Sequence, residues 1–332
     1  MSQTTAPTIA QLNNWSVITV TGPDATDFLQ NQLTNSVKSI QPITAGMVAT
    51  THTQNRFAGY CTAKGRLMAS FWITRQNIKN ELNEDVPQYQ LLISSDLAQS
   101  LSKRLSMFVL RSKVKVIDQT GQHIVYGLLD QNNSQLALLE KLSSIGVVVS
   151  ELPSVRSNGN DCRRYLLSCP IAQEASIQDI SNDNTKSSIN DWNWLEVQSG
   201  IPRITESTFE QFVPQMINME SLKGIDFQKG CYPGQEVVAR SQYRGTIKRR
   251  LQIGHLNINT DVAIGTEIFH SEDPSQPCGM VVLSAPHPSI NQRIDIQAEC
   301  KLEALESGSI HLGSANGPVI QFVTLPYPLI EI

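Results

Sequence analysis

The residues best suited to chemistry lie in one short segment, KGCYPGQEVVAR, which runs from Lys229 to Arg240. Within it, Cys231 stands two residues after a lysine and between Gly230 and Gly234. Glycine lets the backbone turn sharply or approach another group closely, because it has no Cβ atom. The pattern therefore predicts a reactive thiol or a close contact with a ligand.

The residues around the cysteine place it near the start of a helix. Pro233 fits a first helical position and Glu236 fits the first turn, so we expect Cys231 just outside the helix N-terminus. The partial positive charge at that end, together with Lys229, favours thiolate over thiol and predicts a lowered pKa for Cys231. The alternative is an inert cysteine in a structural turn, since glycine-flanked cysteines are common in tight turns.

Beyond this turn the sequence predicts a short charged helix. Glu236, Arg240 and Arg244 are spaced four apart and share one helical face, and Gly245 is placed to end the helix. The basic residues continue through 248–250. This cluster is either a local RNA-binding patch or a solvated helix face followed by an edge strand.

The stretch 212–250 resembles the hallmark segment of the YgfZ family. Members of that family are folate-binding, tRNA-modification-linked proteins related to the T-protein of the glycine cleavage system. The family motif reads K-G-C-Y-x-G-Q-E-x-x-A-R. It is matched here by Lys229, Gly230, Cys231, Tyr232, Gly234, Gln235, Glu236, Ala239 and Arg240.

The resemblance extends over nearly the whole chain. The matching segments are LNNWSVITVTGPDATDFLQNQLTNSV at 12–37, CTAKGRL at 61–67, RSKV at 111–114, WLEVQSGIP at 194–202 and LPY at 325–327. It implies an α+β fold in which two ferredoxin-like halves and a small C-terminal β-barrel form a T-protein-like three-lobed ring. We expect the two halves within residues 1–245 and the barrel within 246–332.

Hydrophobic periodicity agrees with two similar α+β halves. The first half is expected to contain strands at 15–20, 56–61, 67–73, 90–93 and 114–117, with helices after residue 23 and at 96–108. The second is expected to contain strands at 124–129 and 165–167, with helices at 136–142 and ending at residue 200. After residue 245, short strands alternate with turn-forming clusters, which favours a small β-barrel.

The resemblance implies a folate, such as tetrahydrofolate, as the cofactor. Trp15 and Trp192 stand where the family pattern has tryptophans assigned to folate contact, although each could equally fill the core. Gln198 replaces a glutamate that grips the pterin edge in T-protein relatives; an amide keeps a donor and an acceptor but lacks the charge. Lys64 and Arg66 flank a turn and are candidates to meet the glutamate tail of the folate.

The resemblance also implies a role in tRNA processing through the maintenance or assembly of iron-sulfur enzymes, including tRNA-thiolating enzymes. Cys231 would then act as a thiolate that transiently holds a cluster, a persulfide or the sulfur of a partner. Lys229 would tune its charge. Gly230 and Gly234 would set its turn, and Gln235, Glu236 and Arg240 would fix the adjoining helix.

Two alternatives belong to other classes of protein. A T-protein-type aminomethyltransferase or methyltransferase is disfavoured, because no aspartate lies between Cys61 and Glu84, where T-proteins carry one that assists the folate nitrogen chemistry. A non-catalytic interaction scaffold would keep the fold with Cys231 as a packing residue.

Composition restricts the remaining possibilities. A net charge of −4 and a pI near 5.9 predict no strong direct nucleic-acid binding by the whole surface. The six cysteines lack a paired CxxC, which favours a reducing compartment and predicts no permanently bound metal. The N-terminus has no secretory pattern and no apolar run reaches membrane-spanning length, so we expect a cytoplasmic protein.

Overall fold

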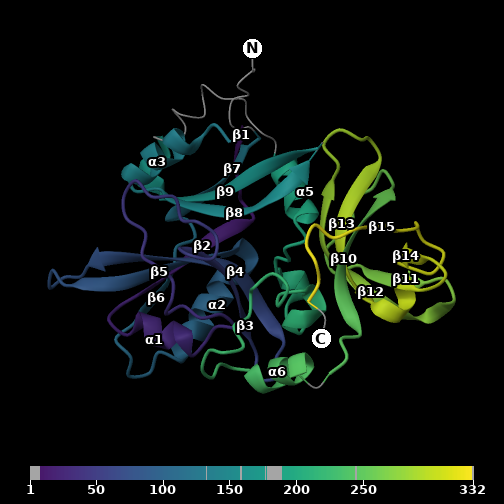
Figure 1. The fold of residues 1–332 in the computed structure, drawn as a ribbon, viewed down its shortest axis with the longest axis horizontal. Coiled ribbons are helices and arrows are strands. Elements are labelled where there is room, and N and C mark those ends of the chain that lie inside the picture. Colours follow the sequence, from purple (N-terminus) through teal and green to yellow (C-terminus); the bar gives the residue numbers. More distant parts are fainter. Residues whose placement is uncertain are drawn as a thin grey trace, which may run out of the picture.

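The computed structural model describes residues 8–131, 133–157, 159–175, 177, 189–243 and 245–330. Its strands form three antiparallel sheets. Figure 1 shows these sheets as three lobes around the middle of the molecule. The α+β class and the three-lobed arrangement implied by the resemblance are confirmed.

The first lobe is a five-stranded sheet of order β3-β4-β5-β2-β6. Without β3, the order β6-β2-β5-β4 is that of a ferredoxin-like unit. Helices α1 and α2 pack against this sheet, and α2 buries Leu97, Leu101 and Leu105 at helical spacing. The elements are β2 (Trp15–Thr21), α1 (Ala25–Gln30), β3 (Asn55–Cys61), β4 (Leu67–Lys79), β5 (Asp85–Ser94), α2 (Ser95–Met107) and β6 (Lys115–Asp118).

The second lobe repeats this plan with a strand from the beginning of the chain. Its sheet has the order β1-β7-β9-β8, in which β1 pairs with β7 at one edge. The elements are β1 (Thr8–Gln11), β7 (His123–Asp130), α3 (Leu136–Ser144), β8 (Val148–Ser157) and β9 (Asn160–Pro170). The periodicity predicts neither β1 nor β8; β8 contains Pro153 at an irregular register, which weakens the strand pattern.

The third lobe is a curled six-stranded sheet of order β14-β11-β12-β13-β10-β15. The amide of Leu312 donates to the carbonyl of Pro318 at 2.9 Å, and the amide of Ile320 donates to the carbonyl of Ile310 at 2.8 Å. Strand β14 therefore joins the segment before β15, and the sheet closes as a barrel. The strands are β10 (Arg249–Asn257), β11 (Glu267–His270), β12 (Asp273–Pro286), β13 (Arg293–Lys301), β14 (Ile310–Leu312) and β15 (Gln321–Val323).

Two helices and a long irregular stretch connect the lobes. Helix α5 (Ile189–Gln198) packs between the second lobe and the barrel, and α6 (Gln235–Tyr243) precedes the barrel. Near the C-terminus, the hydroxyl of Tyr327 donates to the carbonyl of Gly200 at 2.7 Å, which ties the tail to the middle of the molecule. Among the described helices, none is long and apolar enough to cross a lipid bilayer.

Candidate functional site

The cysteine segment forms a turn that precedes α6. The helix begins at Gln235, so Pro233 lies before it and not at its first position as expected. Cys231 is exposed and stands four residues before the first helical residue. The helix end therefore lies farther from the thiol than the sequence suggested, and the influence of its partial charge, which is confined to the first turn, is correspondingly weaker.

The two glycines of the segment have different structural roles. Gly234 has a φ of +82°, and a Cβ atom there would lie 2.4 Å from the carbonyl oxygen of Thr62. The same Cβ atom would lie 2.7 Å from the Cα atom of Gly65, in the β3–β4 turn. Gly230 has no positive φ, and a Cβ atom on it would have open space, so the turn does not require glycine at that position.

Lys229 points into the protein and fastens the segment to the first lobe. Its Nζ donates to the carbonyl oxygens of Gln30 and Leu33, and it lies 4.7 Å from the centre of the buried Tyr232 ring. Burial lowers the pKa of Lys229 to about 8, and the charges of Asp226 and Cys231 oppose this shift. Because its ammonium donates to these carbonyls, the main structural role of Lys229 is to hold the turn against the first lobe.

The charged residues of α6 lie mainly in solvent. Glu236 and Arg240 form the expected i,i+4 pair at 3.5 Å, with side chains 88% and 72% exposed, so the pair contributes little. The amide of Gln235 donates to the carbonyl of Tyr232 at 3.2 Å, which joins turn and helix. Arg244 lies outside the described residues.

The cysteines differ sharply in exposure. Cys231 is exposed, whereas the other five are buried. Burial raises the pKa of Cys61 and raises that of Cys169 to about 11, which keeps these thiols protonated and inert. Reagents in solution therefore reach Cys231 first.

A pocket with tryptophan walls lies between the first lobe, the second lobe and α5. Trp15 and Trp192, far apart in sequence, both line this inner pocket, together with Trp72. Trp192 is only 1% exposed, and Gly127 makes room for its ring, because a Cβ atom there would lie 2.2 Å from it. The indole nitrogens of Trp15 and Trp192 have no hydrogen-bond partner among the described residues.

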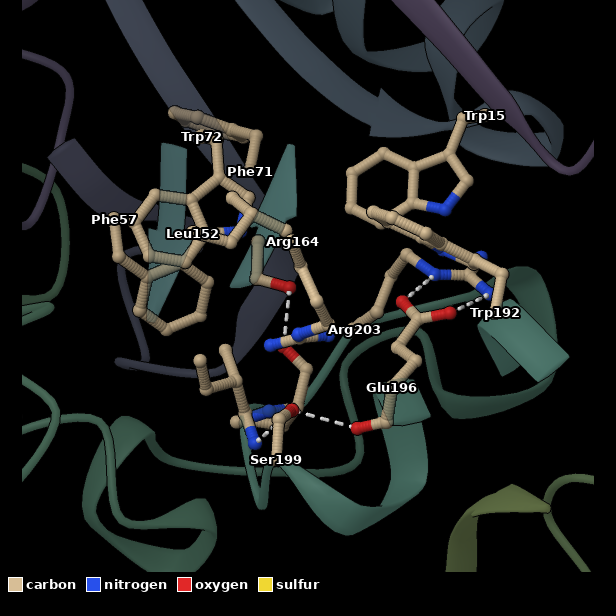
Figure 2. Close-up of a pocket in the computed structure, with 13 residues that line it drawn as sticks. Trp15, Phe57, Phe71, Trp72, Leu152, Arg164, Trp192, Glu196, Ser199 and Arg203 are labelled. Atoms are coloured by element: carbon tan, nitrogen blue, oxygen red, sulfur yellow. Dashed lines mark hydrogen bonds and ion pairs between the residues drawn. The ribbon is translucent and has the colours of Figure 1, made fainter. Parts of the chain in front are cut away.

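The inner pocket also contains buried charges. Figure 2 shows the carboxylate of Glu196 paired with the guanidinium of Arg203, beside Trp15 and Trp192. The two nitrogen–oxygen distances are 2.7 and 3.3 Å, and Arg203 also donates to Ser94 Oγ at 2.6 Å. Because Ser94 belongs to the first lobe, this pair fixes the α5 region to it.

Arg164, on β9, brings a second guanidinium to the inner pocket. It is 1% exposed; Nη2 donates to the carbonyl of Pro153 at 3.1 Å, whereas Nε has no partner among the described residues. Burial lowers the pKa of Arg164 to about 10, and the negative charge of Glu196 opposes the shift. Since Glu196 is already engaged by Arg203, the three side chains together leave one net positive charge at neutral pH.

Two larger cavities lie nearby: the outer cavity shares lining residues with the inner pocket, and the mouth cavity shares lining residues with the outer cavity. The inner pocket has a volume of about 20 Å³, room for one water molecule. The outer cavity, about 170 Å³, shares Phe57, Trp72 and Ile201 with it and is closed on another side by Tyr327. The mouth cavity, about 460 Å³, shares His52 and Lys223 with the outer cavity. By volume the outer cavity is large enough for a small ring system, whereas the inner pocket would have to widen to admit one.

The structure does not bring the other expected folate contacts to these cavities. Gln198 donates to Asp295 Oδ1 of the barrel at 3.1 Å, and does not line the inner pocket. It is two residues from Glu196, which places the two side chains on different faces of α5. Lys64 and Arg66 lie in the β3–β4 turn, where Arg66 donates to the carbonyl of Gln211, so they adjoin the cysteine segment instead.

The basic cluster after α6 does not form a continuous patch. Arg249 pairs with Glu299 at 2.9 Å, and Arg250 is buried against Glu220. These two positive charges are therefore neutralised by barrel and loop carboxylates. Within the described residues, no group of three or more His, Cys, Asp and Glu side chains is placed to hold a metal ion.

Sequence reasoning missed Glu196, Arg164 and Trp72. Glu196 follows Trp192 by four residues, so the two share a helical face, and a carboxylate on that face was a usable signal. Arg164 offered no signal, because arginine in a strand is normally exposed. Trp72 looked like any core residue of a predicted strand.

No protein-family model matches the chain. Curated relatives named tRNA-modifying protein YgfZ do. That of Edwardsiella ictaluri is 30% identical over 255 residues, which is 74% of this chain and 70% of that protein. Those of Pectobacterium carotovorum and Photobacterium profundum are 29% and 28% identical, and each match covers 74% of this chain and 69% of the relative.

A solved structure shares the fold. The crystal structure of the glycine cleavage system aminomethyltransferase T from Bartonella henselae matches with a TM-score of 0.69, over 98% of this chain and 87% of that one. Their sequence identity is 15%, so this likeness establishes the fold alone. From the identity to the Edwardsiella protein and the extent of the match, we conclude that the chain belongs to the YgfZ family.

Proposed function

We propose that this protein binds a folate, such as tetrahydrofolate, in the connected inner pocket and outer cavity, and supports tRNA modification in the cytoplasm. The observation that carries the folate proposal is the partnerless Nε of buried Arg164 beside tryptophan walls. A buried donor without an acceptor costs free energy, which a ligand with acceptor atoms on its edge recovers. A pterin is such a ligand.

The residues present fit the flat head of a folate. Phe57, Trp72 and Tyr327 supply aromatic surfaces around the outer cavity. Arg164 and the free indole nitrogens of Trp15 and Trp192 supply donors deeper inside. A bound reduced folate carries one-carbon units. Contact with Trp15 and Trp192 requires the inner pocket to widen when the ring enters.

Cys231 supplies the second part of the proposal. It is an exposed thiol in a turn held by Lys229 and Gly234, and it is a candidate to transiently hold a cluster, a persulfide or the sulfur of an iron-sulfur enzyme. The relatives' name, tRNA-modifying protein, supports the link to tRNA, and iron-sulfur enzymes that thiolate tRNA are the proposed partners. Glu196 is the single carboxylate that lines the inner pocket, and it is paired with Arg203. A carboxylate held in this way is poorly placed to act as an acid or base, which favours an accessory role over aminomethyl or methyl transfer.

Calorimetric titration with tetrahydrofolate under anaerobic conditions tests the folate site. Trp72→Phe and Trp192→Phe should weaken binding. Trp194→Phe is the matched control, because its indole nitrogen bonds to Asp295 and its ring lies outside the inner pocket and outer cavity. No saturable heat with the unmodified protein would exclude folate binding and favour the interaction scaffold.

Tests in cells separate the cysteine from the folate site. Cys231→Ser, expressed in a strain without its own copy of the protein, should lower the fraction of thiolated tRNA while the purified variant keeps its folate affinity. Cys61→Ser, at a buried thiol, is the control for cysteine loss as such. Normal tRNA thiolation in the Cys231→Ser strain would remove the reactive-thiol part of the proposal.

A further inference from the structure

The mouth cavity presents cationic side chains next to the outer cavity. His52 and Lys223 line both spaces, and Arg56 lines the mouth cavity beside them. The ammonium of Lys223 makes no hydrogen bond or ion pair with any described residue. An unpaired cation at the junction of two cavities is suited to a ligand that extends from one into the other.

The backbone fixes how these side chains are presented. Lys223 and His52 have φ values of 56° and 71°, in the left-handed region that residues other than glycine rarely adopt. Arg56 is held by the carbonyl of His52 at 3.0 Å and by Ser39 Oγ at 2.7 Å. Such conformations persist where the surrounding structure enforces them, often at ligand sites.

The charges around the mouth cavity leave it positive. Arg56 and Lys223 carry two positive charges, and Asp226 is the carboxylate among the lining residues. Oδ1 of Asp226 accepts hydrogen bonds from the amides of Gln228 and Lys229 at 2.9 and 3.1 Å, so this oxygen is already engaged by the backbone. Burial, Lys223 and Arg56 lower the pKa of His52, so it is mainly neutral at pH 7.

We propose that the mouth cavity binds the carboxylates of the folate's glutamate chain, with Lys223 and Arg56 as their charge partners. This inference rests on the proposed folate site. A folate is linear, with its ring at one end and glutamate at the other, so a ring in the outer cavity directs the tail past His52 and Lys223. Each added glutamate brings another carboxylate, and the protein therefore prefers folates with several glutamates.

Calorimetry with three ligands tests this preference: tetrahydropteroate, which has no glutamate, tetrahydrofolate with one, and tetrahydrofolate with three. The unmodified protein should bind the triglutamate about tenfold more tightly than tetrahydropteroate, a gain typical of a few partly exposed charge pairs. Lys223→Asn, which suits a left-handed backbone, should abolish most of this gain, so that the variant loses clearly more affinity for the triglutamate than for tetrahydropteroate. Lys223→Arg should keep it.

Lys64→Asn is the matched control, because Lys64 is an exposed lysine outside all three spaces. Equal binding of the three ligands, or an equal loss for all three in Lys223→Asn, would overturn the inference and leave the folate site intact. Loss of the gain in Lys64→Asn alone would move the tail to the β3–β4 turn and also overturn it. If none of the three ligands binds, both the inference and the proposed function fail.

Discussion

Lys229 carries its charge at a position where water solvates it poorly. Two carbonyl oxygens and the face of Tyr232 surround the ammonium, and burial lowers its pKa to about 8. In the unfolded chain the same group titrates near 10.5. Between these two values the unfolded state binds more protons than the folded state, so the free energy of unfolding rises with pH. Below about pH 8, Lys229 is protonated in both states, and burying its charge lowers the free energy of unfolding by the full amount.

We therefore predict a pH-dependent difference between the unmodified protein and Lys229→Met. In urea unfolding at about pH 7, 8, 9 and 9.5, the free energy of unfolding of the unmodified protein should rise relative to that of the variant. The comparison cancels the titration of groups common to both proteins. A difference that stays constant over this range would contradict a lowered pKa for Lys229.

Cys231 should be the thiol that reagents modify in the folded protein. We predict that iodoacetamide adds one carbamidomethyl group to the native protein and six after unfolding, since the other five cysteines are buried. Intact-mass measurement counts the groups, and peptide mapping locates the first. Cys231→Ser should take up none in the native state. Rapid modification of a second cysteine would show that a buried thiol opens to solvent.

At the scale of elements, the cysteine turn and the β3–β4 turn depend on each other through two glycines. Gly234 and Gly65 pack backbone against backbone, which leaves no room for a side chain. This contact sets the position of α6 on the first lobe. Gly230, by contrast, has a backbone conformation and surroundings that would accept a residue with a Cβ atom.

Substitution of the two glycines of the cysteine segment should therefore give opposite results. Gly234→Ala should lower the free energy of unfolding by about 1 to 3 kcal/mol, because a positive φ and a backbone clash both oppose a Cβ atom. Gly230→Ala should change it by less than about 1 kcal/mol. Chemical denaturation measures both. Equal losses would mean that the turn differs from the one described.

Sequence patterns found elements whose stabilising contacts are local or periodic. β2 and α2 have clear apolar periodicity, and both were predicted within one or two residues. β1 was missed because its partner, β7, lies more than a hundred residues away, and no local pattern reveals such a pairing. β8 was missed because Pro153 argues against a strand unless an irregular register accommodates it.

At the scale of the whole molecule, the inner pocket exists only because three parts of the chain meet. The family resemblance points to Trp15, Trp192 and the cysteine segment from the sequence alone. It also points to Gln198, whose side chain bonds to Asp295 of the barrel and does not line the inner pocket, and which face of α5 meets the pocket depends on packing that the sequence does not reveal. Arg164 was unpredictable for the same reason: its burial follows from the junction of two lobes, not from β9 itself.

The Glu196–Arg203 pair should be a main fastening between α5 and the first lobe. Glu196→Gln leaves Arg203 buried without its counter-charge, and we expect a loss of about 3 to 5 kcal/mol in the free energy of unfolding. Glu236→Gln breaks an exposed pair and serves as the control, with stability close to that of the unmodified protein. Similar stability of both variants would show that the buried pair is dispensable.

The position of Tyr327 has a consequence for protein synthesis. The outer cavity takes one wall from Phe57 and another from Tyr327, which leaves the ribosome 270 residues later, as 327 minus 57. At roughly 5 to 20 residues per second, that delay is on the order of 15 to 50 s. During this interval a nascent chain can fold its first lobe but has no complete cavity. A chain that stops before residue 327 therefore lacks one wall of the outer cavity, and completing this cavity is one of the last steps in making the molecule.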